Sequence, residues 1–134
     1  MKKLSIIIWL ACIGLFLVHQ LLQKGLHWEC YFLDSFLDPF LSMPILLGGI
    51  QLERTFLLRQ FKGIHTASTY QFTLLEIGVL SLFFSLLFEE GFPYWSAQFT
   101  RDSWDYLAYF LGSCFFCFFI NTNNFSLDSV KKYI

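Results

Sequence analysis

The chain has 134 residues, of which 56% are apolar, 21% aromatic and 14% charged, and its formal net charge is −1. A soluble domain of this length buries too little surface to hide so many apolar side chains, which excludes an ordinary soluble domain. The small negative net charge argues against a role in binding nucleic acid. The composition therefore indicates an integral membrane protein whose first partner is the lipid bilayer.

The first apolar block covers residues 4–22 and contains no Asp, Glu, Lys or Arg. A helix of ~17–20 residues, rising ~1.5 Å per residue, spans the ~30 Å hydrocarbon layer. Lys2 and Lys3 resemble the positive start of a signal peptide. However, the apolar run continues well past Cys12 and no small-residue cleavage site follows it. We expect residues 4–22 to form the first transmembrane helix.

The second block, residues 38–58, has an apolar centre interrupted by Pro39, Pro44 and two glycines. Membrane helices tolerate Pro and Gly where neighbouring helices satisfy the freed backbone groups. The sequence predicts a transmembrane helix that begins near Pro39 and kinks at Pro44. A re-entrant or interfacial segment is the alternative.

Two further blocks complete the chain, residues 71–88 with Glu76 as their only charge and residues 104–120 with only Asp105. Four spans predict an all-α bundle of four transmembrane helices in a single membrane domain, residues 1–134, with both termini on one side. Seven Lys and Arg residues fall on the side of the termini and two on the other. The positive-inside rule then places the N and C termini in the cytoplasm.

Each of the last three predicted helices carries a polar or small-residue face. Asp102 and Asp105 start the last helix in an arrangement resembling a capping box, and acids suit the positive end of a helix dipole. Asp105 also continues a helix face through Tyr109 and Gly112. It is therefore either a helix cap or part of a binding site, and the sequence leaves both alternatives open. Small residues at helical spacing let membrane helices approach closely. Two such faces are Gly78, Ser81, Ser85 and Glu89 in the third helix, and Asp38, Ser42, Ile45 and Gly49 in the second.

If these faces pack together, Asp38, Glu89 and Asp105 converge at the external interface. Crowded carboxylates repel one another unless a proton, a cation or a basic partner joins them, and Arg101 and His19 are the nearby basic groups. Three interpretations stay open: an internal salt-bridge lattice, a proton or divalent-cation site, and a site for a cationic or hydroxyl-rich lipid headgroup. Hard oxygen ligands favour Mg²⁺ or Ca²⁺, although the sequence does not identify a metal.

Glu76 lies about one turn inside the cytoplasmic end of the third helix. It either forms an ion pair with Arg54 or Arg59 or acts as a proton-relay acid.

The segment "FEEGFPYWSAQFTRDSWDYLAYFLG" resembles the closing part of VanZ-like membrane proteins, with matches at Glu89, Arg101, Asp105, Tyr109 and Gly112. "SFLDPFLSMPILL" and "LFFSLLFEEGFP" are similar to a group of four-span bacterial proteins labelled "magnesium citrate secondary transporter". Two adjacent acids are usual in the first motif of that group, whereas Pro39 holds the second place here. The resemblance implies a multi-pass protein of the bacterial cytoplasmic (inner) membrane. VanZ-like proteins are associated with glycopeptide (teicoplanin) resistance.

The sequence thus predicts a VanZ-like membrane protein whose external acidic cluster binds a cation or an envelope-lipid headgroup. The candidate binding residues are Asp38, Glu89, Arg101, Asp105 and Tyr109. One alternative is a small secondary transporter acting as a homo-oligomer, and another is a non-catalytic subunit or assembly factor of a larger membrane complex. We expect no enzyme, because the chain offers no nucleophile–base pair.

Overall fold

The structure is a computed structural model that describes residues 3–26, 31–62, 70–96 and 102–121. Two long helices come first, α1 (Lys3–Gly25) and α2 (Tyr31–Lys62). The next helical run consists of α3 (Leu74–Leu86), a π-helical turn η1 (Leu87–Gly91) and the short helix α4 (Phe92–Trp95). The last run is α5 (Ser103–Phe115) followed by a second π-helical turn, η2 (Phe116–Ile120). These four described ranges contain no β-strand.

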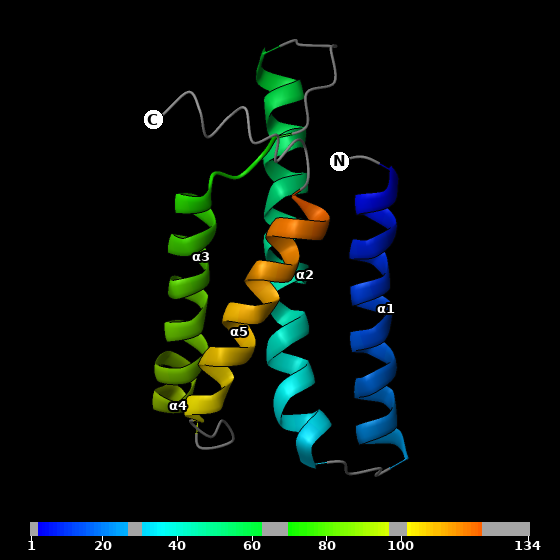
Figure 1. Cartoon of the computed structure of the whole chain (residues 1–134), viewed down its shortest axis with the longest axis vertical. Helices are drawn as coiled ribbons and strands as arrows, with labels where there is room; N and C mark the ends of the chain where they lie inside the picture. Colours follow the sequence, from blue (N-terminus) through cyan, green and yellow to red (C-terminus); the bar gives the residue numbers. More distant parts are fainter. Residues whose placement is uncertain (1–2, 27–30, 63–69, 97–101, 122–134) are drawn as a thin grey trace.

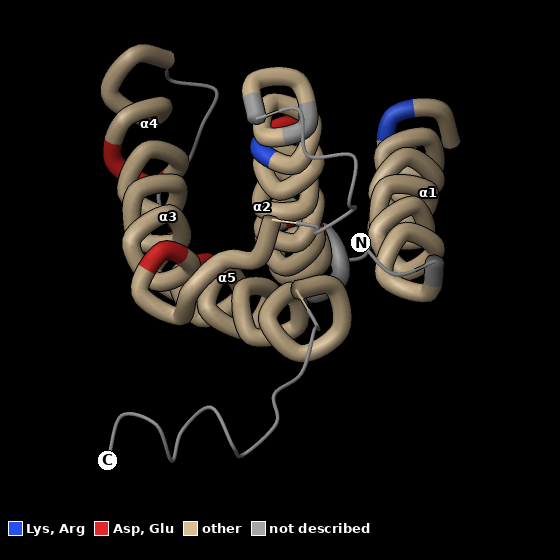
Figure 2. Tube along the Cα trace, turned by 90° about the horizontal axis from the view of Figure 1, so that it is seen from above, with Lys and Arg blue, Asp and Glu red and all other residues tan. Residues whose placement is uncertain are grey.

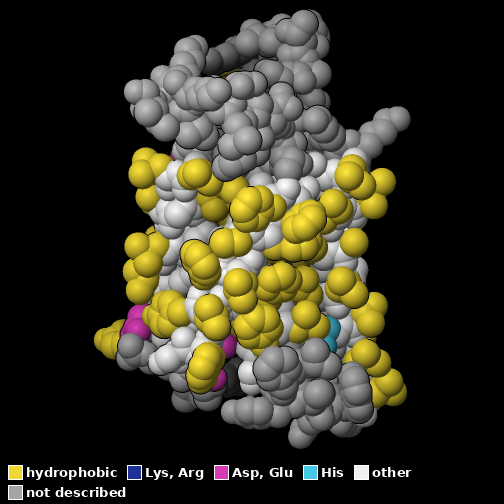
Figure 3. Space-filling model, viewed as in Figure 1, with side chains coloured by type: hydrophobic (Ala, Val, Ile, Leu, Met, Phe, Trp, Pro, Cys, Tyr) yellow, Lys and Arg dark blue, Asp and Glu magenta, His cyan; other side chains and the backbone are white. Residues whose placement is uncertain are grey.

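Within the described residues, three segments are long and apolar enough to cross a membrane: Leu4–Gly25, Ser35–Leu58 and Ser103–Ile120. Large apolar side chains point outward from the bundle, and Leu21 is 70% exposed. Figure 3 shows hydrophobic side chains over the middle of one face, with acidic and histidine side chains below them. So much outward apolar surface suits lipid rather than water. The prediction of an all-helical fold is confirmed for the described residues, and three helices are long and apolar enough to span a membrane. The fourth span and the position of the termini stay predictions.

Helix α2 differs from its predicted form because it begins at Tyr31, well before Pro39. Both Pro39 and Pro44 lie inside this one helix. Proline has no backbone N–H, so Pro44 leaves the carbonyl of Phe40, four residues earlier, without its intrahelical donor. A neighbouring helix can approach this carbonyl, and α5 does so, as described below.

The helices form a bundle in which α2 lies between α1 and α3, and α5 crosses one side of α2 from α3 toward α1 (Figures 1 and 2). The most extensive packing joins α2 to α5, followed by α1 to α2. The start of α1 and the end of the run formed by α5 and η2 lie toward the same end of the bundle (Figure 1). The opposite end gathers the C-terminal end of α1, the N-terminal ends of α2 and α5, and η1. This second end carries the predicted acidic cluster.

Two glycines set the close helix contacts. A Cβ at Gly112 of α5 would collide with the carbonyl oxygen of Phe40 in α2, so only glycine fits there. A Cβ at Gly48 of α2 would collide with the indole of Trp9 in α1, whose Nε1 donates to the carbonyl of Ile45 at 3.1 Å. The predicted packing face of α2 ran through Gly49, but it is the adjacent Gly48 that meets α1. Small residues thus bring α2 close to both neighbours.

The end of the bundle opposite the acidic cluster is held by buried amide side chains. Gln51 of α2 is 1% exposed, and its Nε2 donates to the carbonyl of Tyr70 at 2.9 Å and to Oδ1 of Asn121 at 3.1 Å. Asn121 also pairs with Phe72, accepting from its N–H at 3.0 Å and donating to its carbonyl at 2.9 Å. These bonds join α2, the segment before α3 and the end of η2.

We expect Asn121→Ala to lower the free energy of unfolding by about 1–2 kcal/mol, because it leaves the buried backbone groups of Phe72 without partners. Thermal unfolding of the detergent-solubilised protein, followed by circular dichroism, measures the change. Gln71→Ala is the matched control, since Gln71 is exposed and lies one residue from Phe72. Equal unfolding temperatures for the two variants would contradict a structural role for Asn121.

Candidate functional site

A cavity of about 740 Å³ opens at the acidic end of the bundle. Four helical runs contribute to its walls, and carboxylates come from three of them. The polar side chains of its lining include Lys24 of α1, Asp38 of α2, Glu89 of η1, Asp102 just before α5, and Asp105 and Tyr109 of α5. The sequence prediction that acids from separate helices converge at one end therefore matches the observed arrangement.

Asp38 is bound by two side chains of α1. Nδ1 of His19 lies 2.8 Å from Oδ1 of Asp38, and Nε2 of Gln20 donates to Oδ2 at 2.7 Å. His19 is 6% exposed, so this polar contact between α1 and α2 is largely shielded from solvent. Both oxygens of Asp38 already have protein partners, which makes its main role the joining of these helices. His19 was foreseen as a partner of the acids, whereas Gln20 was not.

Glu89 is the most buried carboxylate of the cavity, with 3% of its surface exposed. The hydroxyl of Tyr109 donates to its Oε1 at 3.0 Å, and the backbone N–H of Asp102 donates to its Oε2 at 3.0 Å. Glu89 belongs to the π-helical turn η1. A π turn adds one residue to the helical turn and redirects the side chains that follow, and such turns are frequent at functional sites. Glu89 therefore fixes the start of α5 against η1.

The two acids at the start of α5 have different roles. Asp102 is the N-cap, and its Oδ1 accepts from the backbone N–H of Trp104 at 3.0 Å. The resemblance to a capping box extends no further, because the backbone N–H of Asp102 donates to Glu89 and not to Asp105. Oδ1 of Asp105 is buried and has no hydrogen-bond partner among the described residues. Asp105 also lies within electrostatic reach of Glu89 and Asp102. It is thus the cavity carboxylate with an oxygen left for a ligand.

The remaining predicted residues lie elsewhere or outside the description. Arg101, the predicted basic partner, falls outside the described residues. Glu76 lies near the start of α3, toward the other end of the bundle, where Nη1 of Arg54 is 3.1 Å from its Oε1. Of the two interpretations of Glu76, the structure therefore supports an ion pair with Arg54.

Glu76 is fixed by further bonds that sequence reasoning missed. It forms a capping box with Thr73 and accepts a hydrogen bond from the hydroxyl of Tyr70. This hydrogen bond raises the pKa of Tyr70, since loss of the phenolic proton would place a second negative charge beside the carboxylate. The spacing of Thr73 and Glu76 is the sequence signal that predicts the capping box.

The geometry does not fit a resident metal ion. Among the described residues, no group of three His, Cys, Asp or Glu side chains is placed to hold one. The oxygens of Asp38 and Glu89 accept from protein donors, whereas Mg²⁺ and Ca²⁺ take several oxygen ligands at once. The divalent-cation interpretation therefore lacks a set of ligands among the described residues.

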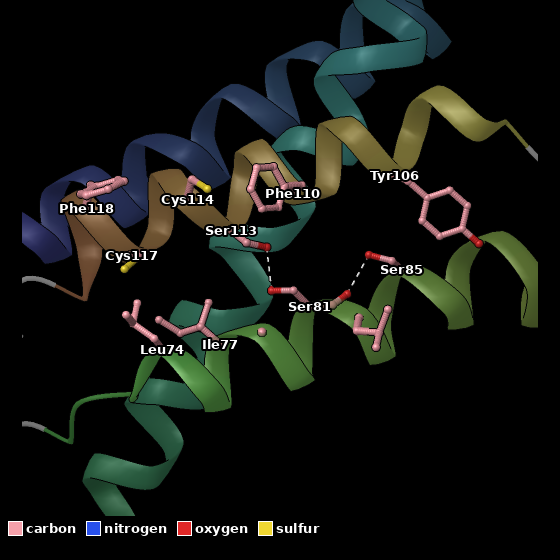
Figure 4. A pocket seen from close by; sticks show the side chains of 12 residues that line it. Leu74, Ile77, Ser81, Ser85, Tyr106, Phe110, Ser113, Cys114, Cys117 and Phe118 are labelled. Atoms are coloured by element: carbon pink, nitrogen blue, oxygen red, sulfur yellow. Dashed lines mark hydrogen bonds between the residues drawn. The ribbon is translucent and has the colours of Figure 1, made fainter. Parts of the chain in front are cut away.

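A second, apolar groove of about 460 Å³ lies between α3 and α5 (Figure 4). The hydroxyl of Ser113 donates to that of Ser81 at 2.7 Å, which brings the two helices close together, as expected from the small-residue face of α3. Ser85 donates to the carbonyl of Ser81 instead. Since the side chains of this groove are mainly apolar and its hydroxyls are hydrogen-bonded within the protein, the acidic cavity is the stronger candidate site.

Comparison with known proteins adds no relative: no protein-family model, curated protein or solved structure matches the chain.

Proposed function

We propose that this chain is a multi-pass membrane protein that binds the positively charged headgroup of an envelope lipid in its acidic cavity. Oδ1 of Asp105 carries the proposal, because it is buried and has no hydrogen-bond partner among the residues that the structure describes. A buried polar atom that makes no hydrogen bond is costly, so a bound donor stabilises it. The volume of about 740 Å³ fits a polyatomic ligand better than a single ion.

The position of the cavity supports a lipid rather than a soluble ligand. It opens at one end of helices whose outer surfaces are apolar, the level at which headgroups meet the hydrocarbon layer. Aromatic side chains, Phe16, Phe88 and Phe92, line it beside the carboxylates. A headgroup joined to acyl chains presents the same combination of charge and apolar surface.

In this proposed membrane protein, α3 and η1 form a fourth membrane span, and both termini lie on the cytoplasmic side. From Leu74 to Gly91, α3 and η1 rise ~27 Å at ~1.5 Å per residue, close to the ~30 Å hydrocarbon thickness. An even number of crossings and the excess of Lys and Arg on the side of the termini support a cytoplasmic location for both termini. The cavity then faces the exterior of a bacterial inner membrane, as in the VanZ-like proteins that the sequence resembles.

We expect Asp105→Asn to weaken the binding of a cationic amphiphile about five- to tenfold, because the amide removes the negative charge and adds donors facing Glu89 and Asp102. The probe is dodecylammonium, titrated into the protein in uncharged detergent and followed by tryptophan fluorescence. Glu53→Gln is the matched control, since Glu53 is an exposed acid nearer the other end of α2. The proposal fails if Asp105→Asn and Glu53→Gln bind dodecylammonium as tightly as the original chain.

A further inference from the structure

The acidic cavity also carries a positive charge on a different helix. Lys24, in the last turn of α1, lines the cavity and is exposed at its rim, with the amide side chain of Gln23 beside it. Asp105, whose Oδ1 has no hydrogen-bond partner among the described residues, comes from the first turn of α5. Opposite charges from separate helices suit a ligand that has a positive group at one end and a negative group at the other.

From this arrangement we infer that the ligand is a zwitterionic phosphoethanolamine headgroup. Its ammonium binds Asp105 and its phosphate binds Lys24. This inference rests on the proposed function and specifies its ligand. An ionised carboxylate only accepts hydrogen bonds, and a primary ammonium supplies three donors. A lysine ammonium is in turn a common partner of phosphate.

The same chemistry separates this headgroup from the other common phospholipids. A phosphocholine has a quaternary ammonium with no N–H, so it cannot donate to the buried oxygen of Asp105. A phosphoglycerol offers the same phosphate to Lys24 but has no cation for Asp105, so the carboxylates of the cavity gain no opposite charge from it. The phenylalanine side chains of the cavity contact the glycerol and the first methylenes of the lipid.

The test is native mass spectrometry of the full chain in detergent with dioleoyl-phosphatidylethanolamine, the matching phosphatidylcholine or the matching phosphatidylglycerol. We expect the ethanolamine lipid to bind about tenfold more tightly than the other two. Lys24→Gln should weaken its binding several-fold without weakening dodecylammonium, which has no phosphate. Lys3→Gln, at the other end of α1, serves as the matched control and should change neither.

Three results would overturn the inference. The first is equal binding of the three lipids, and the second is an equal loss for both probes in Lys24→Gln. In the third, water-soluble O-phosphoethanolamine binds as tightly as the lipid, which would assign the site to a soluble ligand. Since dodecylammonium binding tests Asp105 independently of phosphate, the proposed function can hold when this inference fails.

Discussion

Gly112→Ala is expected to destabilise the protein by about 1–3 kcal/mol, the usual range for overpacking a well-filled interior. The added methyl group would collide with the carbonyl oxygen of Phe40 and press on Cβ of Met43. A backbone oxygen cannot move aside as the end of a flexible side chain can, so α5 must shift away from α2. This pair of helices makes the most extensive contact of the bundle, which is why a single methyl group has so large an effect.

Gly78→Ala is the control, because a Cβ there meets no atom within 4 Å. Alanine is favoured over glycine in a helix by up to ~1 kcal/mol, so Gly78→Ala should leave stability unchanged or raise it. Unfolding of both variants in mixed detergent micelles with increasing sodium dodecyl sulfate gives the two free energies. No loss of stability in Gly112→Ala would show that the α2–α5 contact is looser than described, and an equal loss in Gly78→Ala would show that the effect is not specific to this contact.

The close approach at Gly112 has a cause that lies in α2. Pro44 lacks the N–H that would bond to the carbonyl of Phe40, so this oxygen is open to a neighbouring helix. Gly112 has no side chain to collide with this oxygen, so α5 can pack closely against α2 at this point. The sequence contains both residues, but nothing in it indicates that they meet.

The part of the fold predicted from sequence is the part that hydrophobic patterning determines. Apolar blocks of ~17–20 residues have one stable solution in lipid, the helix, because backbone groups must be satisfied internally. Asp38 and Asp105 fall at the predicted start of a helix and Glu89 at the predicted end of one, so the alternation of helix directions brings all three to one end of the bundle. The sequence did not determine which side chains would bind these three acids at that end.

What the sequence could not predict depends on local register. Glu89 reaches the bundle interior from a π-helical turn, and no residue pattern distinguishes that turn from the α-helix before it. A rotation of one residue also decides that Gly48, not Gly49, contacts Trp9. The partner of Asp38 that was missed, Gln20, is neutral and was overlooked by a search for charges.

The described carboxylates of the cavity divide into structural and available groups. Asp38 joins α1 to α2, Asp102 caps α5, and Glu89 joins η1 to α5. Each has protein donors, so each positions the cavity wall. Asp105 differs because one buried oxygen has no partner, which makes it the residue through which a ligand would contribute most binding energy.

Glu89→Ala is expected to lower the free energy of unfolding by about 2–4 kcal/mol, because the change removes a buried charged acceptor of two hydrogen bonds. The hydroxyl of Tyr109, a residue only 5% exposed, and the N–H of Asp102 would both lose their acceptor. Glu89→Gln should cost less, since the amide oxygen still accepts one of the two bonds. Thermal unfolding of the purified protein by circular dichroism gives the order of the variants.

Glu90→Ala is the control that separates the effect of burial from the effect of charge. Glu90 carries the same carboxylate one residue later, but it is exposed and accepts a hydrogen bond from the hydroxyl of Tyr106 at 3.3 Å. An exposed contact of this kind contributes about 0.5 kcal/mol or less. If Glu90→Ala and Glu89→Ala unfold at the same temperature, Glu89 does not hold α5 against η1. If only Glu89→Ala is destabilised, the wall that positions Asp105 depends on this one carboxylate, and dodecylammonium binding should weaken with it.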